Sequence, residues 1–191
     1  LYIFSFFILF SMKKYILIFL ICLFIPFSVN ATSVVMDMDS KRVLSGSSEN
    51  ETKLIASTTK ILTAMVVINN TDIKNIVTVD ENVLKSFGSG IYIEIGEKIS
   101  VEDLLYGLLL RSGNDAAIAL ACYVGGSMEG FSILMNSLAS SIGMTNSNFI
   151  NASGLENEKG DGNTSTAKDM AILMSYAMQN DTFRRITSTK H

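Results

Sequence analysis

The sequence predicts a mixed α/β domain of the α+β type, in which a short pair of strands precedes a series of helices. Three observations indicate this fold class. Segments rich in β-branched and apolar residues flank a polar turn early in the chain, apolar residues recur later at helical spacing, and polar capping residues stand where helices should begin. A length of 191 residues suits one domain with a hydrophobic core of its own.

The strand candidates come first in chain order. Residues 33–38 and 42–44 lie on either side of a three-residue polar turn, which predicts a hairpin. The nearly continuous apolar segment 61–68 predicts a helix that is buried on most sides. Short strands are expected at 77–79 and 91–93, in a stretch punctuated by glycine.

Helices dominate the rest of the chain. Patterns that resemble capping boxes at 100–103 and 166–169 predict two helix starts, and the first of these helices should reach Leu110. An apolar helix is expected from about Asn114. Apolar residues at i, i+3, i+4, i+7, i+8 and i+11 within 131–142 predict an amphipathic helix.

The N-terminal segment has the pattern of a secretory signal peptide. Lys13 and Lys14 give it a positive start, residues 15–27 are apolar apart from one proline, and small residues at 29–31 offer a cleavage site after Ala31. The alternative is a membrane anchor, but thirteen residues fall short of the ~20 that a membrane span needs. A cleaved signal is therefore favoured.

This interpretation divides the chain into two parts. Residues 1–31 are expected to be the signal peptide and 32–191 the functional domain. Because position 1 is leucine, two alternatives stay open: a non-standard initiation at Leu1, or a translated upstream stretch, in which residues 1–11 precede a true start at Met12. Export would place the domain outside the cytoplasm, with membrane contact only through the signal segment or a missing C-terminal anchor.

Charge and composition exclude several classes of function. The chain has 15 basic and 18 acidic residues, a net charge of −3, and no basic patch of the kind that nucleic-acid binders carry. It has two cysteines and a single histidine, which is the final residue. These counts exclude a zinc finger, a Cys-x-x-Cys redox site and a serine triad with an internal histidine.

The first motif that carries chemistry is Ser57-Thr58-Thr59-Lys60. A serine and a lysine three residues apart share one helix face, so the amine can reach the hydroxyl. A lysine whose pKa is lowered by burial can remove the serine proton, which a serine needs in order to act as a nucleophile. On this motif alone, a capping serine beside a solvated lysine remains the simpler interpretation.

The second motif is Ser112-Gly113-Asn114, between two apolar segments. By itself it is best explained as a turn between two helices, with Ser112 or Asn114 as a capping residue. Together, the two motifs match two of the three elements that mark β-lactamases and penicillin-binding proteins.

The segments around both motifs resemble the D-alanyl-D-alanine carboxypeptidases, which are low-molecular-mass penicillin-binding proteins of peptidase family S11. The resemblance extends in order over about residues 33–190. The matching segments are ASTTKILTA (56–64), GEK (96–98), VEDLLYGLL (101–109), SGNDAA (112–117), FINASGL (149–155) and STAKDM (165–170).

The resemblance implies the serine β-lactamase and DD-peptidase transpeptidase-like fold, and an enzyme of the cell envelope that removes the last D-alanine from peptidoglycan stem peptides ending in D-Ala-D-Ala. It implies that Ser57 is the nucleophile, Lys60 its general base, Ser112 a proton relay and Asn114 a substrate-binding residue. No metal or cofactor is implied. β-Lactam antibiotics are implied as ligands that acylate Ser57.

The chain departs from the family pattern at two places. The third family element, a Lys-Thr-Gly strand, would lie beyond residue 191, so we expect a fold that is incomplete at the C-terminus, with an unpaired sheet edge. We also expect that this chain alone releases no detectable D-alanine and is prone to aggregate. The nearby Ser188 and Lys190 match a non-catalytic stretch of the family. Asn163 stands where relatives often carry histidine, and the sequence assigns it no catalytic role.

Two alternative functions remain open at this point. An inactive, truncated remnant that still binds peptidoglycan or penicillin would explain the absent third element. A serine β-lactamase is disfavoured because Gly113 replaces the aspartate of the usual Ser-Asp-Asn motif and no convincing deacylation glutamate motif is present.

Overall fold

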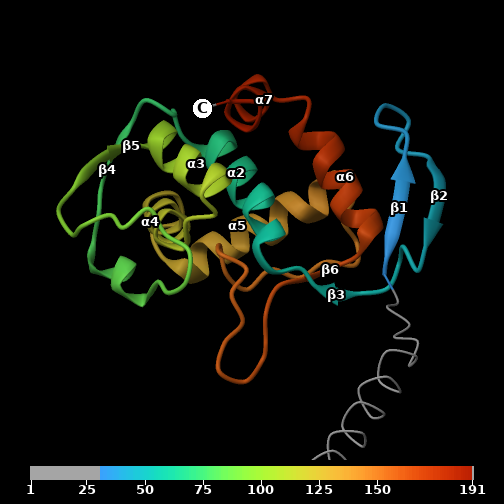
Figure 1. Cartoon of the computed structure of the whole chain (residues 1–191), viewed down its shortest axis with the longest axis horizontal. Coiled ribbons are helices and arrows are strands. Elements are labelled where there is room, and N and C mark those ends of the chain that lie inside the picture. Colours follow the sequence, from blue (N-terminus) through green and yellow to red (C-terminus); the bar gives the residue numbers. More distant parts are fainter. Residues whose placement is uncertain (1–30, 191) are drawn as a thin grey trace, which may run out of the picture. The chain divides into compact units, whose positions relative to one another are not determined.

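The computed structural model describes residues 31–190, and the chain divides into two units between Ala31 and Thr32. The predicted signal segment therefore lies outside the described residues, except for Ala31. Figure 1 shows the elements of the second unit. Its helices are α2 (Thr59–Asn70), α3 (Val101–Leu110), α4 (Asn114–Gly125), α5 (Met128–Ile142), α6 (Ala167–Ala177) and α7 (Asp181–Thr187), with 3₁₀ turns η1 (Ala56–Thr58) and η2 (Glu81–Lys85).

The strands form three separate antiparallel pairs. They are β1 (Ser33–Met36) with β2 (Val43–Ser47), β3 (Lys53–Leu54) with β6 (Thr164–Ser165), and β4 (Ile76–Thr78) with β5 (Lys98–Ser100). The predicted hairpin is confirmed, with a bulge between Val35 and Met36. Among the described residues β1 and β2 pair only with each other, so each has one edge without a strand partner.

The strand expected at 91–93 is wrong. Tyr92 has a left-handed backbone with φ 61°, which a strand does not allow. The backbone N–H groups of Ile91, Tyr92 and Ile93 donate to the side-chain carboxylate of Asp115, so they are not available to a neighbouring strand. A contact with a residue more than twenty positions away thus overrides the local β preference.

The core is built around α2, which contacts α3, α4, α5, α6 and α7 (Figure 1). Leu62, Met65 and Val67 of this helix are almost fully buried, and burying such side chains contributes about 1.5–3 kcal/mol each. The prediction of a helix buried on most sides is confirmed. Since other helices pack against α2 on most sides, they also hold the residues at its buried N-terminal end.

Side-chain caps define the helix starts. Ser100 accepts the Asp103 N–H and Thr166 accepts the Asp169 N–H, which confirms both predicted caps. Ser127 and Asn180 cap α5 and α7 in the same way. Within the described residues no single helix is long and apolar enough to cross a membrane, although the bent pair of α4 and α5 passes the same test of length and composition.

Candidate active site

Ser57 lies on the exposed 3₁₀ turn η1, directly before α2. The turn is forced close to a neighbouring loop, because a Cβ atom on Gly154 would lie 1.9 Å from the Ala56 carbonyl oxygen. Gly154 also has φ +83°, a conformation that glycine adopts without strain. A residue without a side chain is therefore needed at position 154 to let the loop support the turn.

Lys60, in the first turn of α2, is 2% exposed. Its amine Nζ lies 3.2 Å from Ser57 Oγ, 2.7 Å from Asn114 Oδ1 and 2.7 Å from the carbonyl oxygen of Ser153. Burial lowers the pKa of this amine from 10.5 to about 8. The motif alone suggested a solvated lysine, whereas the structure shows a buried amine beside a serine hydroxyl.

Asn114 is the first residue of α4 and is 3% exposed. Its side chain accepts from Lys60 through Oδ1 and donates through Nδ2 to the Phe87 carbonyl at 2.6 Å. Its backbone N–H donates to the Ser89 carbonyl at 2.8 Å. These bonds join the start of α4 both to the lysine and to the segment that follows η2.

Ser112 lies two residues before Asn114, in the turn between α3 and α4. It is half-buried and has φ 55°, a left-handed conformation that costs a non-glycine residue about 1–2 kcal/mol. Within residues 31–190 no hydrogen bond joins its hydroxyl to Ser57, Lys60 or Asn114. The structure therefore unites three of the four predicted site residues in one network and leaves Ser112 beside it, in a strained turn of the kind found at functional sites.

A buried asparagine organises the loop that supports Lys60. Asn163 is 1% exposed, and its Oδ1 accepts the backbone N–H groups of Ile150 (2.7 Å) and Asn151 (3.1 Å). Its Nδ2 donates to Thr59 Oγ1 at 2.9 Å and to the Asn151 carbonyl at 2.8 Å. All four hydrogen-bonding positions of this amide are therefore used.

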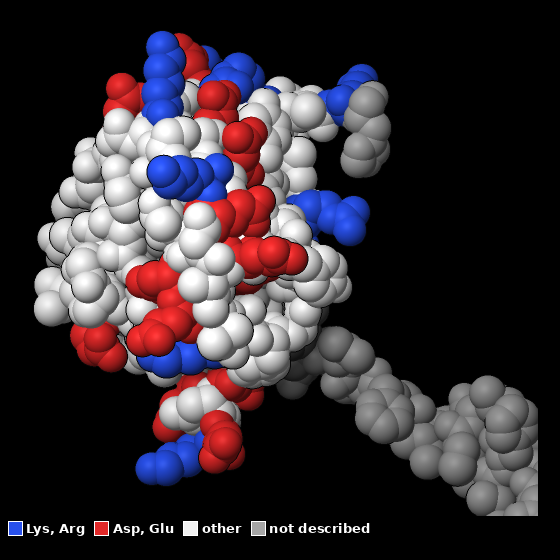
Figure 2. Space-filling view, turned by 90° about the vertical axis from the view of Figure 1, so that its left-hand side faces the viewer, with Lys and Arg blue, Asp and Glu red and all other residues white. Residues whose placement is uncertain are grey.

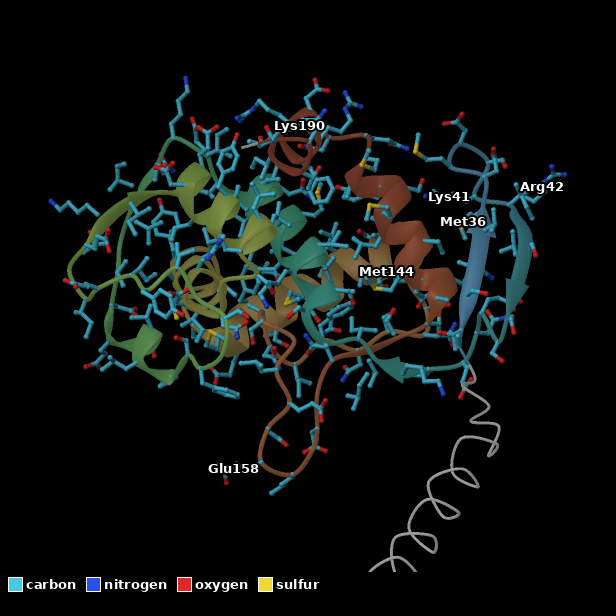
Figure 3. All side chains as sticks on the ribbon, in the orientation of Figure 1. Met36, Lys41, Arg42, Met144, Glu158 and Lys190 are labelled. Carbon is cyan, nitrogen blue, oxygen red and sulfur yellow. The ribbon has the colours of Figure 1, made fainter. Side chains whose placement is uncertain are left out.

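The same residue borders the Ser57 turn on two sides. The Asn163 carbonyl accepts the Ile55 N–H at 3.1 Å, while its side chain binds Thr59. Asn151 then folds the loop, since its Oδ1 accepts the N–H groups of Ser153 and Gly154. Figure 3 shows Glu158 in the part of this loop that extends away from the helices, so the supporting bonds lie at the loop's base.

Sequence reasoning missed the roles of Asn151 and Asn163. Both lie in or beside segments that carry the family resemblance, but only their burial and hydrogen bonds reveal what they hold in place. Ser188, the other serine near a lysine, donates to the Arg185 carbonyl at the end of α7 and is exposed. Lys190, labelled in Figure 3, lies beside that helix rather than at the site.

Asp115, the second residue of α4, ties a loop to a helix start, as Asp169 does by accepting the backbone N–H of Asn146. Asp115 is 5% exposed, and its carboxylate accepts the backbone N–H of Tyr92 at 2.6 Å. Among residues 31–190, no group of three or more histidine, cysteine, aspartate or glutamate side chains is placed to hold a metal ion.

The comparisons with known proteins agree with this geometry. The family model described as D-alanyl-D-alanine carboxypeptidase matches residues 26–191. The curated D-alanyl-D-alanine carboxypeptidase DacF of Bacillus subtilis is 34% identical over 163 residues, which cover 83% of this chain and 41% of DacF. The chain thus spans about two fifths of the length of that relative.

Solved structures support the same assignment. The crystal structure of a D-alanyl-D-alanine carboxypeptidase from Mycobacterium tuberculosis matches with a TM-score of 0.80 and 33% identity, over 86% of this chain and 61% of that one. Penicillin binding protein 6B from Escherichia coli matches with a TM-score of 0.77 and 30% identity, over 87% and 57%. With its α+β fold, its buried lysine beside a serine and these matches, the chain belongs to the D-alanyl-D-alanine carboxypeptidase family.

Proposed function

We propose that the protein to which this chain belongs is a serine-type D-Ala-D-Ala carboxypeptidase, in which Ser57 is the nucleophile and Lys60 its general base. The observation that carries the proposal is the position of the Lys60 amine. A neutral amine has two N–H donors and one lone pair. The two donors match the acceptors at 2.7 Å on Asn114 and Ser153, which leaves the lone pair for the proton of the Ser57 hydroxyl at 3.2 Å.

The pKa of Lys60 suits this role. At a value of about 8, roughly a tenth of the amines are neutral near pH 7, compared with well under a thousandth at the ordinary lysine value. A base is most effective when its pKa lies near the operating pH. Burial by α2 and its neighbours thus supplies the activation that a serine nucleophile requires.

The reaction then proceeds in two steps. Ser57 Oγ gives its proton to Lys60 and forms a bond to the carbonyl carbon of the penultimate D-alanine, the C–N bond to the terminal D-alanine breaks, and the proton returns through the Ser112 hydroxyl to the leaving amine. Water then attacks the ester and releases the shortened peptide. Asn114 would hold the substrate's peptide amide, and the backbone N–H of Ser57, near the start of α2, would stabilise the oxyanion.

We also propose that the protein acts on peptidoglycan stem peptides in the cell envelope after export, and that β-lactam antibiotics acylate Ser57. The relatives' names support the substrate and the antibiotic, since one neighbour is a penicillin binding protein and others are D-alanyl-D-alanine carboxypeptidases. The N-terminal sequence pattern supports export.

The experiment is D-alanine release from a peptide ending in D-Ala-D-Ala, measured with the complete gene product that contains this chain. Ser57→Ala is expected to abolish release, and Ser188→Ala, at the exposed serine beside α7, is the matched control that keeps it. Release that survives Ser57→Ala in folded protein contradicts the proposal. Rapid hydrolysis of a β-lactam with no release of D-alanine would favour a β-lactamase instead.

A further inference from the structure

A polar cavity of about 360 Å³ lies beside the candidate active site and has no role in the chemistry described above. Its volume lies in the range of small-ligand sites. The cavity is lined by Ser89, Gly90, Tyr92, Leu110 and Arg111.

Two walls of this cavity are joined to the catalytic residues. Arg111 directly precedes Ser112 in the chain, and the Ser89 carbonyl accepts the backbone N–H of Asn114 at 2.8 Å. The cavity therefore borders Ser112 and Asn114, so part of a peptide held by Asn114 would lie beside it.

Tyr92 is presented to solvent by a strained backbone. Its side chain is 84% exposed although its φ is 61°, a conformation that costs about 1–2 kcal/mol in a residue other than glycine. The buried Asp115 carboxylate holds this conformation by accepting the Tyr92 N–H. An exposed aromatic ring held in a strained conformation beside a cavity is a feature of ligand-binding segments.

Arg111 supplies a cation that no carboxylate neutralises within the described part of the chain. The ion pairs there involve Lys53, Arg184 and Arg185. The face that carries β4 and β5 is rich in acidic side chains (Figure 2), among them the exposed Asp80, Glu81, Glu94 and Glu97. Most of this surface repels an anionic ligand, and Arg111 is the one basic residue among the five that line the cavity.

We propose that this cavity is a subsite for a carboxylate on the residue that precedes D-Ala-D-Ala, bound by the Arg111 guanidinium with the Ser89 hydroxyl and the Tyr92 ring beside it. The inference rests on the proposed carboxypeptidase function and names its substrate class, an acidic rather than a neutral peptide. A guanidinium binds a carboxylate through two parallel N–H donors, which a lysine or an amide does not reproduce.

The test uses two peptides that end in D-Ala-D-Ala and differ only in the preceding residue, which carries a carboxylate in one and a carboxamide in the other. With the complete gene product, kcat/KM for D-alanine release is expected to favour the carboxylate peptide about tenfold, the size of one charge-assisted contact. Arg111→Gln should reduce this ratio to about one. Lys85→Gln, which removes another exposed cation of the same region, should leave the ratio unchanged.

The failure of this inference can be told apart from the failure of the proposed function. A ratio that is equal in wild type and Arg111→Gln refutes the subsite while the enzyme remains active. If neither peptide is cleaved, the proposed function fails, and calorimetric measurement of peptide binding tests the subsite instead. The subsite is supported if wild type binds the carboxylate peptide more tightly than the carboxamide peptide and Arg111→Gln does not. It is refuted if wild type and Arg111→Gln bind the carboxylate peptide with equal affinity.

Discussion

The buried amine of Lys60 should make the stability of the domain depend on pH. Its folded-state pKa is about 8, against 10.5 for an ordinary lysine. The unfolded chain therefore binds more protons than the folded chain between these two values, and stability rises with pH across that window. Below pH 8 both states are protonated and the full penalty for burying the charge remains; above 10.5 both are neutral and the penalty is gone.

The magnitude follows from the two pKa values. A shift of this size corresponds to about 3 kcal/mol in total, of which about 2 kcal/mol should be recovered between about pH 7 and about pH 9.5. Lys60→Met keeps the apolar part of the side chain and removes the titrating group. The difference in unfolding free energy between wild type and Lys60→Met should therefore change by about 2 kcal/mol across this range, in favour of wild type at the higher pH.

Urea unfolding of the two proteins, followed by circular dichroism at both pH values, measures this difference. Comparing the change with pH, rather than the absolute stabilities, cancels the cost of leaving Asn114 Oδ1 and the Ser153 carbonyl without their donor in the variant. Lys85→Met, at an exposed lysine, is the control and should follow wild type. Parallel pH dependence in wild type and Lys60→Met would refute the account of Lys60 as a base activated by burial.

Three further predictions concern the supporting loop and export. Asn163→Leu should reduce the free energy of unfolding by about 2–4 kcal/mol, because it leaves the part-buried N–H groups of Ile150 and Asn151 without acceptors. Asn69→Leu on the exposed face of α2 should change it by less than about 1 kcal/mol in the same denaturation assay. Gly154→Ala should lower the free energy of unfolding by more than about 2 kcal/mol. Gly160 has a similar φ of +81° but nothing within 4 Å of an added Cβ, so Gly160→Ala should lower it by only about 1 kcal/mol. Equal effects would mean that the contact between position 154 and the Ala56 carbonyl is unimportant. N-terminal sequencing of exported protein should show cleavage after Ala31, and a mature protein that keeps the apolar segment would point to an anchor instead.

The sequence predicted the elements whose signals are local. Helices α3 and α6 have caps that the sequence shows, so their starts could be placed. Helix α5 was predicted from its apolar spacing over 131–142, but its start at Met128, capped by Ser127, was not. The two-residue strands β3 and β6 are too short to show alternation, and their pairing joins residues more than a hundred positions apart. Helix α7 was missed because seven residues span too few turns to show a clear period.

In the candidate site too, contacts between residues close in sequence could be predicted, and contacts between distant residues could not. The spacing of Ser57 and Lys60 predicted their contact, because residues three apart share a helix face. The contact of Lys60 with Asn114 joins positions 54 apart and was accessible only through the family resemblance. Asn163 supports the loop through the hydrogen bonds of its buried side-chain amide. No pattern in the sequence indicates these bonds.

The most direct test of the central claim is to identify the residue that a β-lactam acylates. The complete gene product is incubated with fluorescent penicillin, digested and mapped by mass spectrometry. The account predicts one adduct on the peptide that contains Ser57, absent in Ser57→Ala and formed much more slowly in Lys60→Met. Labelling that survives Ser57→Ala in folded protein, or an adduct on Ser188, would contradict it.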